Sequence, residues 1–126
     1  PEEAVQIEAI GERAEAVAEI EEVREAWDIV VSRAVGSLAE VLELSLPLTR
    51  VGGTVVVWKR EAERGGLRAE LQGAGSIIRA AGAGRPRVVR VEAPSLADHR
   101  LVVVVKERTT PVAYPRPAGV RRRRKR

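Results

Sequence analysis

The sequence predicts an α/β fold in which a partly parallel sheet is closed by an antiparallel hairpin. Short, β-branched apolar runs alternate with amphipathic stretches of helical spacing, which is typical of parallel strands joined by helical crossovers. The last two runs follow one another without a helix between them, which favours a hairpin. With 126 residues, 44% of them hydrophobic and 32% charged, the chain can bury the core of one domain or of part of one.

The first quarter of the chain contains two uncertain elements and one clear strand. Residues 4–10 alternate well enough for a short strand and could equally begin a helix. Residues 13–26 are rich in Ala and Glu, with apolar side chains at every third position, which favours a helix or helical turns. The run 27–31 is apolar around one Asp, which indicates a buried parallel strand that ends at Ser32 and Arg33.

The middle of the chain predicts a helix, a strand and a second helix. Ser37 is a good N-cap, and Glu40 completes a capping box, so an apolar helical stripe begins there and ends near Pro47. Residues 54–59 form the next β-branched run and predict a strand. Residues 61–82 favour a helix that four glycines weaken.

The last part of the chain predicts the hairpin and a basic tail. Residues 87–93 alternate, and residues 101–105 are uniformly apolar. Residues 115–126 carry seven bases and no acid, whereas the rest carries 15 bases against 18 acids. The six consecutive bases 121–126 repel one another and suit phosphate binding by counterion release. A solvated tail without a dedicated target is the alternative.

The composition excludes several classes of chemistry. Without Cys there is no disulfide framework, no thiolate zinc site and no cysteine nucleophile, which fits a reducing compartment. One His excludes a histidine-based metal cluster, and no metal is expected. No apolar run approaches the roughly 18 residues of a membrane span, and no signal peptide opens the chain. We therefore expect a cytoplasmic protein without a membrane partner.

Four stretches of the chain, taken in order and spacing, resemble one family. The first is a Gly-Glu-Arg-Ala-Glu turn at 11–15, and the second is an aromatic-Asp-apolar-Ser-Arg-Ala strand at 27–35. The third, at 46–59, is a Pro-containing helix followed by a double Gly and a strand that ends in Trp-Lys. The fourth is a closing His-Arg strand at 99–103 followed by Tyr-Pro-Arg at 114–116. In this pattern the chain resembles the bacterial 16S rRNA 7-methylguanosine methyltransferases, also called glucose-inhibited division protein B.

The resemblance implies a partial domain. It covers the C-terminal half of a Rossmann-like, S-adenosylmethionine-dependent methyltransferase, with a partial sheet and a C-terminal antiparallel hairpin. Residues 1–110 would be that part of the domain, without its first two strands and glycine-rich cofactor loop, and residues 111–126 a disordered Pro/Arg-rich tail. The glycines near 73–84 do not replace the loop, because their spacing misses G-x-G-x-x-G; they predict a weak helix and its exit.

The resemblance also assigns candidate site residues. Ala14 and Glu15 match the turn that meets the cofactor's adenine, and Arg33 matches an Arg beside the cofactor and the target base. From the residues alone, Arg33 follows a strand at its carboxyl end, where open α/β sheets bind ligands. The expected RNA contacts are Lys59, Arg100, Arg116, Arg121, Arg122, Arg123, Arg124, Lys125 and Arg126. Solvated surface residues and an ordinary helix start are the alternatives.

Three functions follow from these observations. The favoured one is methyl transfer from S-adenosylmethionine to a guanine of 16S rRNA in the small ribosomal subunit; no catalytic side chain is assigned, because a purine ring nitrogen is already nucleophilic. A non-catalytic RNA-binding remnant without the cofactor loop is the second, so enzymatic activity is left open, and an unrelated α/β binding module is the third. Strand 27–31 would be a newly exposed edge that pairs with the missing N-terminal half or with a second copy.

Overall fold

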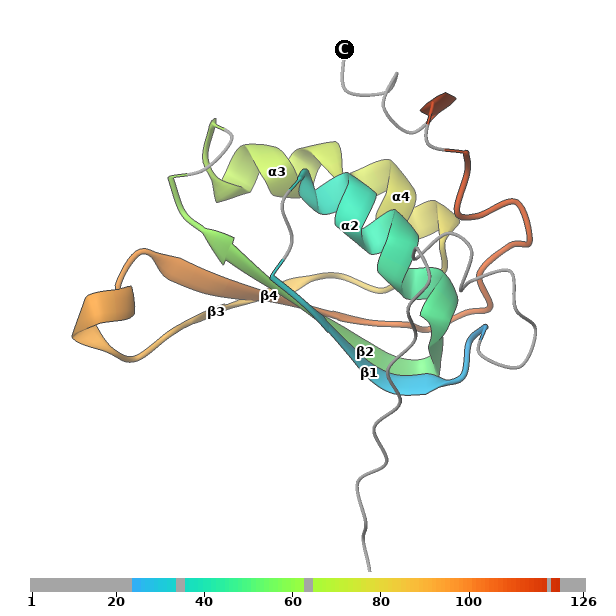
Figure 1. The fold of residues 1–126 in the computed structure, drawn as a ribbon, viewed down its shortest axis with the longest axis horizontal. Coiled ribbons are helices and arrows are strands. Elements are labelled where there is room, and N and C mark those ends of the chain that lie inside the picture. The colour runs from blue at the N-terminus through green and yellow to red at the C-terminus, as the bar shows by residue number, and fades with distance from the viewer. Residues whose placement is uncertain (1–23, 34–35, 63–64, 118, 121–126) are drawn as a thin grey trace, which may run out of the picture.

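The computed structural model describes residues 24–33, 36–62, 65–117 and 119–120, and shows a four-stranded sheet with helices packed on one face (Figure 1). The strands are β1 (Trp27–Ser32), β2 (Thr49–Arg60), β3 (Arg87–Arg90) and β4 (His99–Val105). The helices are α2 (Leu38–Ser45), α3 (Leu67–Gly73) and α4 (Gly75–Ala80), with short 3-10 helices at Leu46–Leu48 and Pro94–Leu96. The element predicted over 4–10 and most of the helix predicted over 13–26 lie outside the described residues.

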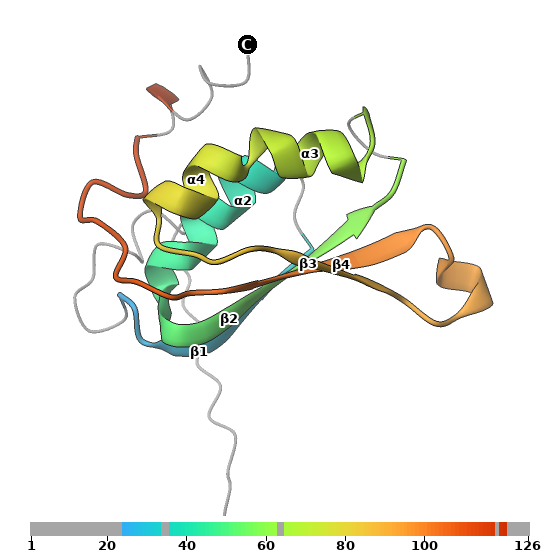
Figure 2. The same ribbon diagram turned by 180° about the vertical axis from the view of Figure 1, so that it is seen from behind.

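The strand order is β1-β2-β4-β3, so the sheet is mixed, as the sequence predicts. β1 pairs parallel with β2, and β4 pairs antiparallel with both β2 and β3, which confirms the predicted hairpin. β1, β2 and β3 therefore run in one direction and β4 in the other (Figure 2). The carboxyl ends of three strands and the start of β4 consequently meet at one edge, which we call the carboxyl edge.

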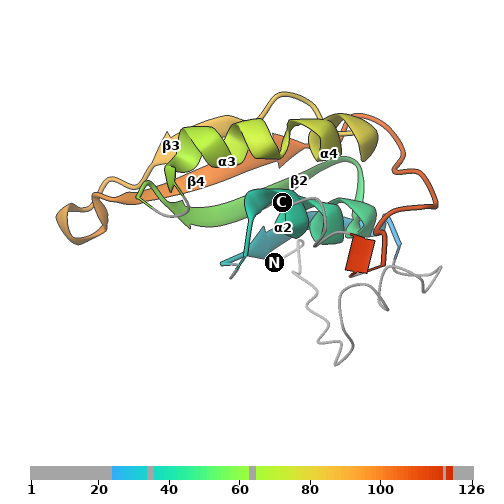
Figure 3. The ribbon, with the colours of Figure 1, turned by 90° about the horizontal axis from the view of Figure 1, so that it is seen from above.

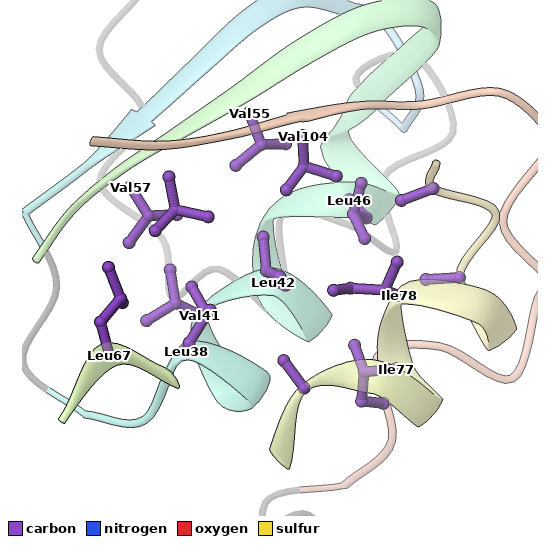
Figure 4. Packing of buried hydrophobic residues seen from close by; sticks show 14 residues of the cluster. Leu38, Val41, Leu42, Leu46, Val55, Val57, Leu67, Ile77, Ile78 and Val104 are labelled. Carbon is purple, nitrogen blue, oxygen red and sulfur yellow. The ribbon is translucent and has the colours of Figure 1, made fainter. Parts of the chain in front are cut away.

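The core lies between the helices and the sheet. Helix α2 begins as predicted: the Ser37 hydroxyl oxygen accepts a hydrogen bond from the backbone N–H of Glu40 at 3.2 Å. Its apolar stripe packs onto the valines of β2 and β4, and α3 and α4 complete the layer (Figures 3 and 4). The fully buried members of this core are Leu38, Leu42, Leu46, Val55, Val57, Ala74, Ala81, Val102 and Val104. No described helix is both long enough and apolar enough to cross a bilayer.

Strand β1 is parallel, as predicted, but it is not buried on both faces. Val30 packs against the core, whereas Ile29 and Val31 are 63% and 67% exposed. The reason is that β1 is the outermost strand among the described residues and that the described helices lie on one face of the sheet (Figure 1). Among the described residues β1 pairs only with β2, and the expectation that this strand is an exposed edge stays a prediction.

The single helix predicted over 61–82 is wrong in its continuity. Two short helices, α3 and α4, meet at Ala74 between two glycines. Glycine loses more backbone entropy in a helix than other residues do, so interrupting the helix here costs the least free energy. Strand β2 also begins earlier than predicted, at Thr49, where it already pairs with Trp27 of β1.

Candidate functional site

Five bases lie at the carboxyl edge of the sheet. One follows β1, two end β2, one ends β3 and one stands at the start of β4; they are Arg33, Lys59, Arg60, Arg90 and Arg100. Open α/β sheets bind ligands outside the carboxyl ends of their parallel strands. Two of these bases are paired with acids, so the exposed Arg33, Arg60 and Arg90 are the charges there that favour an anionic ligand, such as a carboxylate or a phosphate.

Arg33 is exposed and is supported by an aromatic side chain. Its guanidinium carbon lies 5.6 Å from the centre of the Trp58 ring, within the range of a cation–π contact. The indole N–H of Trp58 donates a hydrogen bond to Nδ1 of His99 at 2.5 Å, and the two rings meet edge to face. His99 therefore supports the ring on which Arg33 rests.

Lys59 is buried and does not face solvent. Its side chain is 2% exposed, and its ammonium lies 2.8 Å from a carboxylate oxygen of Glu70, which is 4% exposed. The same ammonium donates to the carbonyl oxygen of Gly36 at 3.1 Å, and Glu70 accepts the backbone N–H of Leu38 at 2.7 Å. This pair thus holds the segment between β1 and α2 at both Gly36 and Leu38. A direct phosphate contact of Lys59 stays a prediction that this burial does not support.

Arg100 is also engaged within the chain. Its guanidinium lies 3.5 Å from a carboxylate oxygen of Glu61 and donates to the carbonyl oxygens of Ala97 and His99 at 2.8 and 2.9 Å. These contacts tie the start of β4 to the end of β2. An RNA contact through Arg100 remains a prediction, and it would have to share the side chain with these partners.

Arg116 anchors the start of the tail to helix α2. Its guanidinium donates to both oxygens of the buried Glu43 carboxylate at 2.7 and 2.6 Å, and its backbone N–H donates to the same group at 2.8 Å. These hydrogen bonds raise the pKa of Arg116 above its ordinary value, against the opposing effect of burial. Its guanidinium also lies 5.4 Å from the centre of the Tyr114 ring, and Tyr114 packs against the core. The anchored part of the chain therefore reaches Arg116, beyond the boundary at 110 expected from the sequence.

Another ion pair joins the buried Lys106 to the half-buried Glu25. Lys106 is fully buried and also donates to the carbonyl oxygens of Leu46 and Thr49, each at 2.8 Å. Burial lowers the pKa of Lys106, and the neighbouring Glu25 offsets only part of this effect. Burial alone would raise the pKa of Glu25, but hydrogen bonds from Lys106 and from the backbone of Thr110, with the Lys106 and Arg24 charges, bring it below its ordinary value of 4.5.

The segment Gly82–Gly84 is not a cradle for an anion. Each of its three backbone N–H groups donates to a carbonyl oxygen of the protein, at Arg79, Ile78 and Val105 in turn. A Cβ at Gly82 would lie 2.3 Å from the carbonyl oxygen of Arg108, so the glycine is needed for close backbone packing. These contacts agree with the interpretation of Gly82 and Gly84 as the exit of a helix.

The structure brings part of the predicted site together. Arg33, Lys59 and Arg100 meet at the carboxyl edge, Arg116 lies on α2, and Ala14, Glu15 and residues 121–126 lie outside the described residues. Sequence reasoning missed the partners Glu43 and Glu70. Both acids fall beside the apolar stripes of their helices, and an acid in such a position signals a buried ion pair.

A sheet with parallel strands, helices on one face and bases at the carboxyl edge defines an α/β domain suited to an anionic ligand. The family model described as rRNA small subunit methyltransferase G matches residues 3–74. The chain is 37% identical over 115 residues to the ribosomal RNA small subunit methyltransferase G of Dehalococcoides mccartyi strain CBDB1, covering 90% of this chain and 47% of the relative. It is 43% identical over 112 residues to the ribosomal RNA small subunit methyltransferase G of Deinococcus radiodurans, covering 86% of this chain and 42% of the relative.

The chain belongs to the rRNA small subunit methyltransferase G family, as its residue pattern predicts. It spans about half the length of the curated relatives that it matches.

Proposed function

We propose that this chain is the carboxy-terminal part of a Rossmann-like methyltransferase that forms 7-methylguanosine in 16S rRNA of the small ribosomal subunit in the cytoplasm. The observation that carries the proposal is the family membership. The mixed sheet, with its basic carboxyl edge, supports it, because that edge is where such a sheet binds its ligands.

The described residues fit only one side of a site for S-adenosylmethionine. Arg33 offers an exposed cation at the end of β1, whereas the backbone N–H groups of Gly82–Gly84 are already used. Ala14 and Glu15 remain proposed contacts to the adenine. When bound, the cofactor supplies a methyl group activated by a sulfonium. The described part of this chain would orient ligands at the carboxyl edge and need supply no Ser, Cys or His nucleophile.

The RNA contacts are best carried by the exposed bases of the carboxyl edge together with the tail. Arg33, Arg60 and Arg90 are exposed and make no ion pair within the described residues. Lys59 and Arg116, in contrast, are paired with Glu70 and Glu43. We therefore assign RNA phosphates to Arg60, Arg90 and residues 121–126, keep Arg33 for the cofactor and the target base, and give the paired bases a supporting role.

The edge can be tested with two substitutions on one strand. Arg90→Gln removes an exposed base at the carboxyl end of β3, and Arg87→Gln removes an exposed base at its other end. In a filter-binding series with 16S rRNA, Arg90→Gln should lower the slope of log affinity against log salt by about one unit. Arg87→Gln is the control and should leave the slope unchanged; equal slopes for both variants would refute the assignment to this edge.

The tail requires a separate binding experiment. Truncation after Gly119 removes six bases, so the same salt slope should fall by several units if the tail contacts phosphates. An unchanged slope would show that the tail does not contact the RNA phosphates.

Cofactor binding distinguishes a partial site from a complete one. The chain alone should bind S-adenosylmethionine weakly or not at all. The backbone hydrogen bonds that the family's glycine-rich loop would donate to the cofactor, worth about 1 kcal/mol each, are absent from it. Low-micromolar binding in a calorimetric titration would contradict this. Methyl transfer to unmodified small subunits should appear when the chain is combined with the part of the Dehalococcoides relative outside the match. Binding of rRNA without methyl transfer in that mixture would favour a non-catalytic remnant.

A further inference from the structure

Three side chains from neighbouring strands gather at the carboxyl edge. Arg33 follows β1, Trp58 stands near the end of β2, and His99 begins β4. These strands are neighbours in the order β1-β2-β4, and their register sets Arg33 beside Trp58 and His99 diagonally across from it (Figure 1). We call these three residues the Trp58 cluster.

Trp58 is held in one orientation by His99. The indole N–H donates to Nδ1 of His99 at 2.5 Å, and the two rings meet edge to face with their centres 5.4 Å apart. A ring nitrogen that accepts a hydrogen bond carries no proton, so His99 is neutral in this arrangement and holds its proton on Nε2. The indole has no other polar atom, so this hydrogen bond decides which way its ring is turned toward Arg33.

Arg33 is held over the ring and not by an acid. Its guanidinium carbon lies 5.6 Å from the centre of the Trp58 ring, and the side chain is exposed and forms no ion pair among the described residues. The N–H donors of a guanidinium lie in its own plane and stay available when an aromatic ring supports one of its faces. Arg33 therefore keeps its donors for a ligand, in a direction that Trp58 helps to set.

Guanine carries acceptors that suit such a donor. Its O6 and N7 atoms accept hydrogen bonds, and Arg is the side chain that most often meets them, whereas adenine has an amino donor in place of O6. In the reaction proposed above, N7 receives the methyl group, so its lone pair must stay free. The acceptor that remains for the Arg33 guanidinium is O6.

We propose that Trp58 and His99 are positioning residues, which hold the Arg33 guanidinium where it donates a hydrogen bond to O6 of a guanine. The inference deepens the proposed function and rests on it for the choice of base. If the Trp58 cluster served strand pairing alone, the chain would show no preference for guanine that depends on these side chains.

Protonation of His99 should release the cluster. A proton on Nδ1 turns that nitrogen into a donor that faces the indole donor, so the hydrogen bond is lost. The added charge also enters a site that already holds more bases than acids. The charged groups around His99 on β1, β2, β4 and the turns beside them are Arg33, Arg60, Glu61, Asp98 and Arg100. The preference for guanine should therefore be complete while His99 is neutral, and be lost as the pH falls from about 8 to about 5, the interval in which histidines gain their charge.

Mononucleotide binding tests the guanine contact, because guanosine and adenosine monophosphates carry the same phosphate. In calorimetric titrations of the full chain at pH 8, the guanosine nucleotide should bind at least about tenfold more tightly. Arg33→Gln should abolish this preference, and Trp58→Leu should lower it by about three- to fivefold. The double variant should equal Arg33→Gln alone, because Trp58 acts through Arg33. Trp27→Leu, at the other end of the sheet, is the control and should leave the preference unchanged.

Fluorescence tests the role of His99 without any ligand. Trp27→Phe leaves Trp58 as the single tryptophan of the chain, and its emission should change in one step between about pH 8 and about pH 5. His99→Gln supplies an amide oxygen that can accept the indole N–H and does not titrate. This variant should therefore remove the fluorescence step and keep the preference for guanine at both ends of the pH range.

Several results would overturn the proposal. One is equal affinity of the wild-type chain for the two nucleotides, and another is an equal loss of both affinities in Arg33→Gln, which would identify a phosphate contact. An unchanged preference in Trp58→Leu, or additive losses in the double variant, would show that Trp58 does not act through Arg33. A fluorescence step that persists in His99→Gln would exclude His99. None of these readouts involves methyl transfer, so a failure of the proposed function is seen separately.

Discussion

Lys59 should contribute to stability and not to the salt dependence of RNA binding. Its ammonium is buried against the Glu70 carboxylate at 2.8 Å, so Lys59→Met leaves a buried, uncompensated negative charge. Breaking a buried pair by removing one partner costs about 3–5 kcal/mol. That is a large part of the roughly 5–15 kcal/mol by which a domain is normally stable.

The double variant Lys59→Met/Glu70→Gln separates charge from packing. The Gln side-chain oxygen can still accept the backbone N–H of Leu38, which Glu70 accepts at 2.7 Å, while both charges are gone. We therefore expect the double variant to be more stable than Lys59→Met alone by at least about 1 kcal/mol.

Urea unfolding at pH 7 measures these differences, with Arg60→Met as the control on the neighbouring exposed position. The control should change the free energy of unfolding by less than about 0.5 kcal/mol. A Lys59→Met variant as stable as this control would refute the buried pair. The pair would also be refuted if the double variant lost as much unfolding free energy as Lys59→Met and Glu70→Gln lose together. A lowered RNA salt slope for a folded Lys59→Met variant would restore the phosphate contact.

Three further predictions concern the same fold. The pKa of Glu25 is below its ordinary 4.5, so the stability that its charge contributes is complete above pH 4.5 and is lost as the pH falls through the folded-state pKa. In a series of unfolding free energies against pH, Glu25→Gln should therefore reduce the loss of stability on the acid side. An unchanged loss there would contradict the pair with Lys106. Leu42→Ala should cost about 2–5 kcal/mol in urea unfolding, because the side chain is fully buried. Gly82→Ala should cost more than about 1 kcal/mol, measured as a lower Tm, because φ is +94° and the new Cβ meets the Arg108 carbonyl.

Local patterns carry most of the fold that the sequence predicts. The capping box at Ser37 and the β-branched runs at 54–59 and 101–105 act over a few residues, and each of them forms the expected element. The exposure of Ile29 and Val31 depends on which helices cover the sheet, and no short pattern contains that information. An apolar run looks the same whether both of its faces are covered or one.

The candidate site is less predictable for a related reason. Position at the end of a strand correctly places Arg33 and Lys59 at the carboxyl edge. Whether a base faces solvent or a buried acid depends on residues 11 and 73 positions away, as Lys59–Glu70 and Glu43–Arg116 show. The periodicity of α2 and α3 reveals that an acid lies beside a buried stripe, but it does not name the cation that neutralises it.

The clamp between Glu43 and Arg116 joins the start of the tail to the core. The Glu43 carboxylate is 1% exposed, and it accepts hydrogen bonds from the guanidinium and from the backbone N–H of Arg116. Helix α2, which carries Glu43, packs onto the buried valines of β2 and β4. A ligand that binds the folded chain through Arg116 and its neighbours would therefore also stabilise that core.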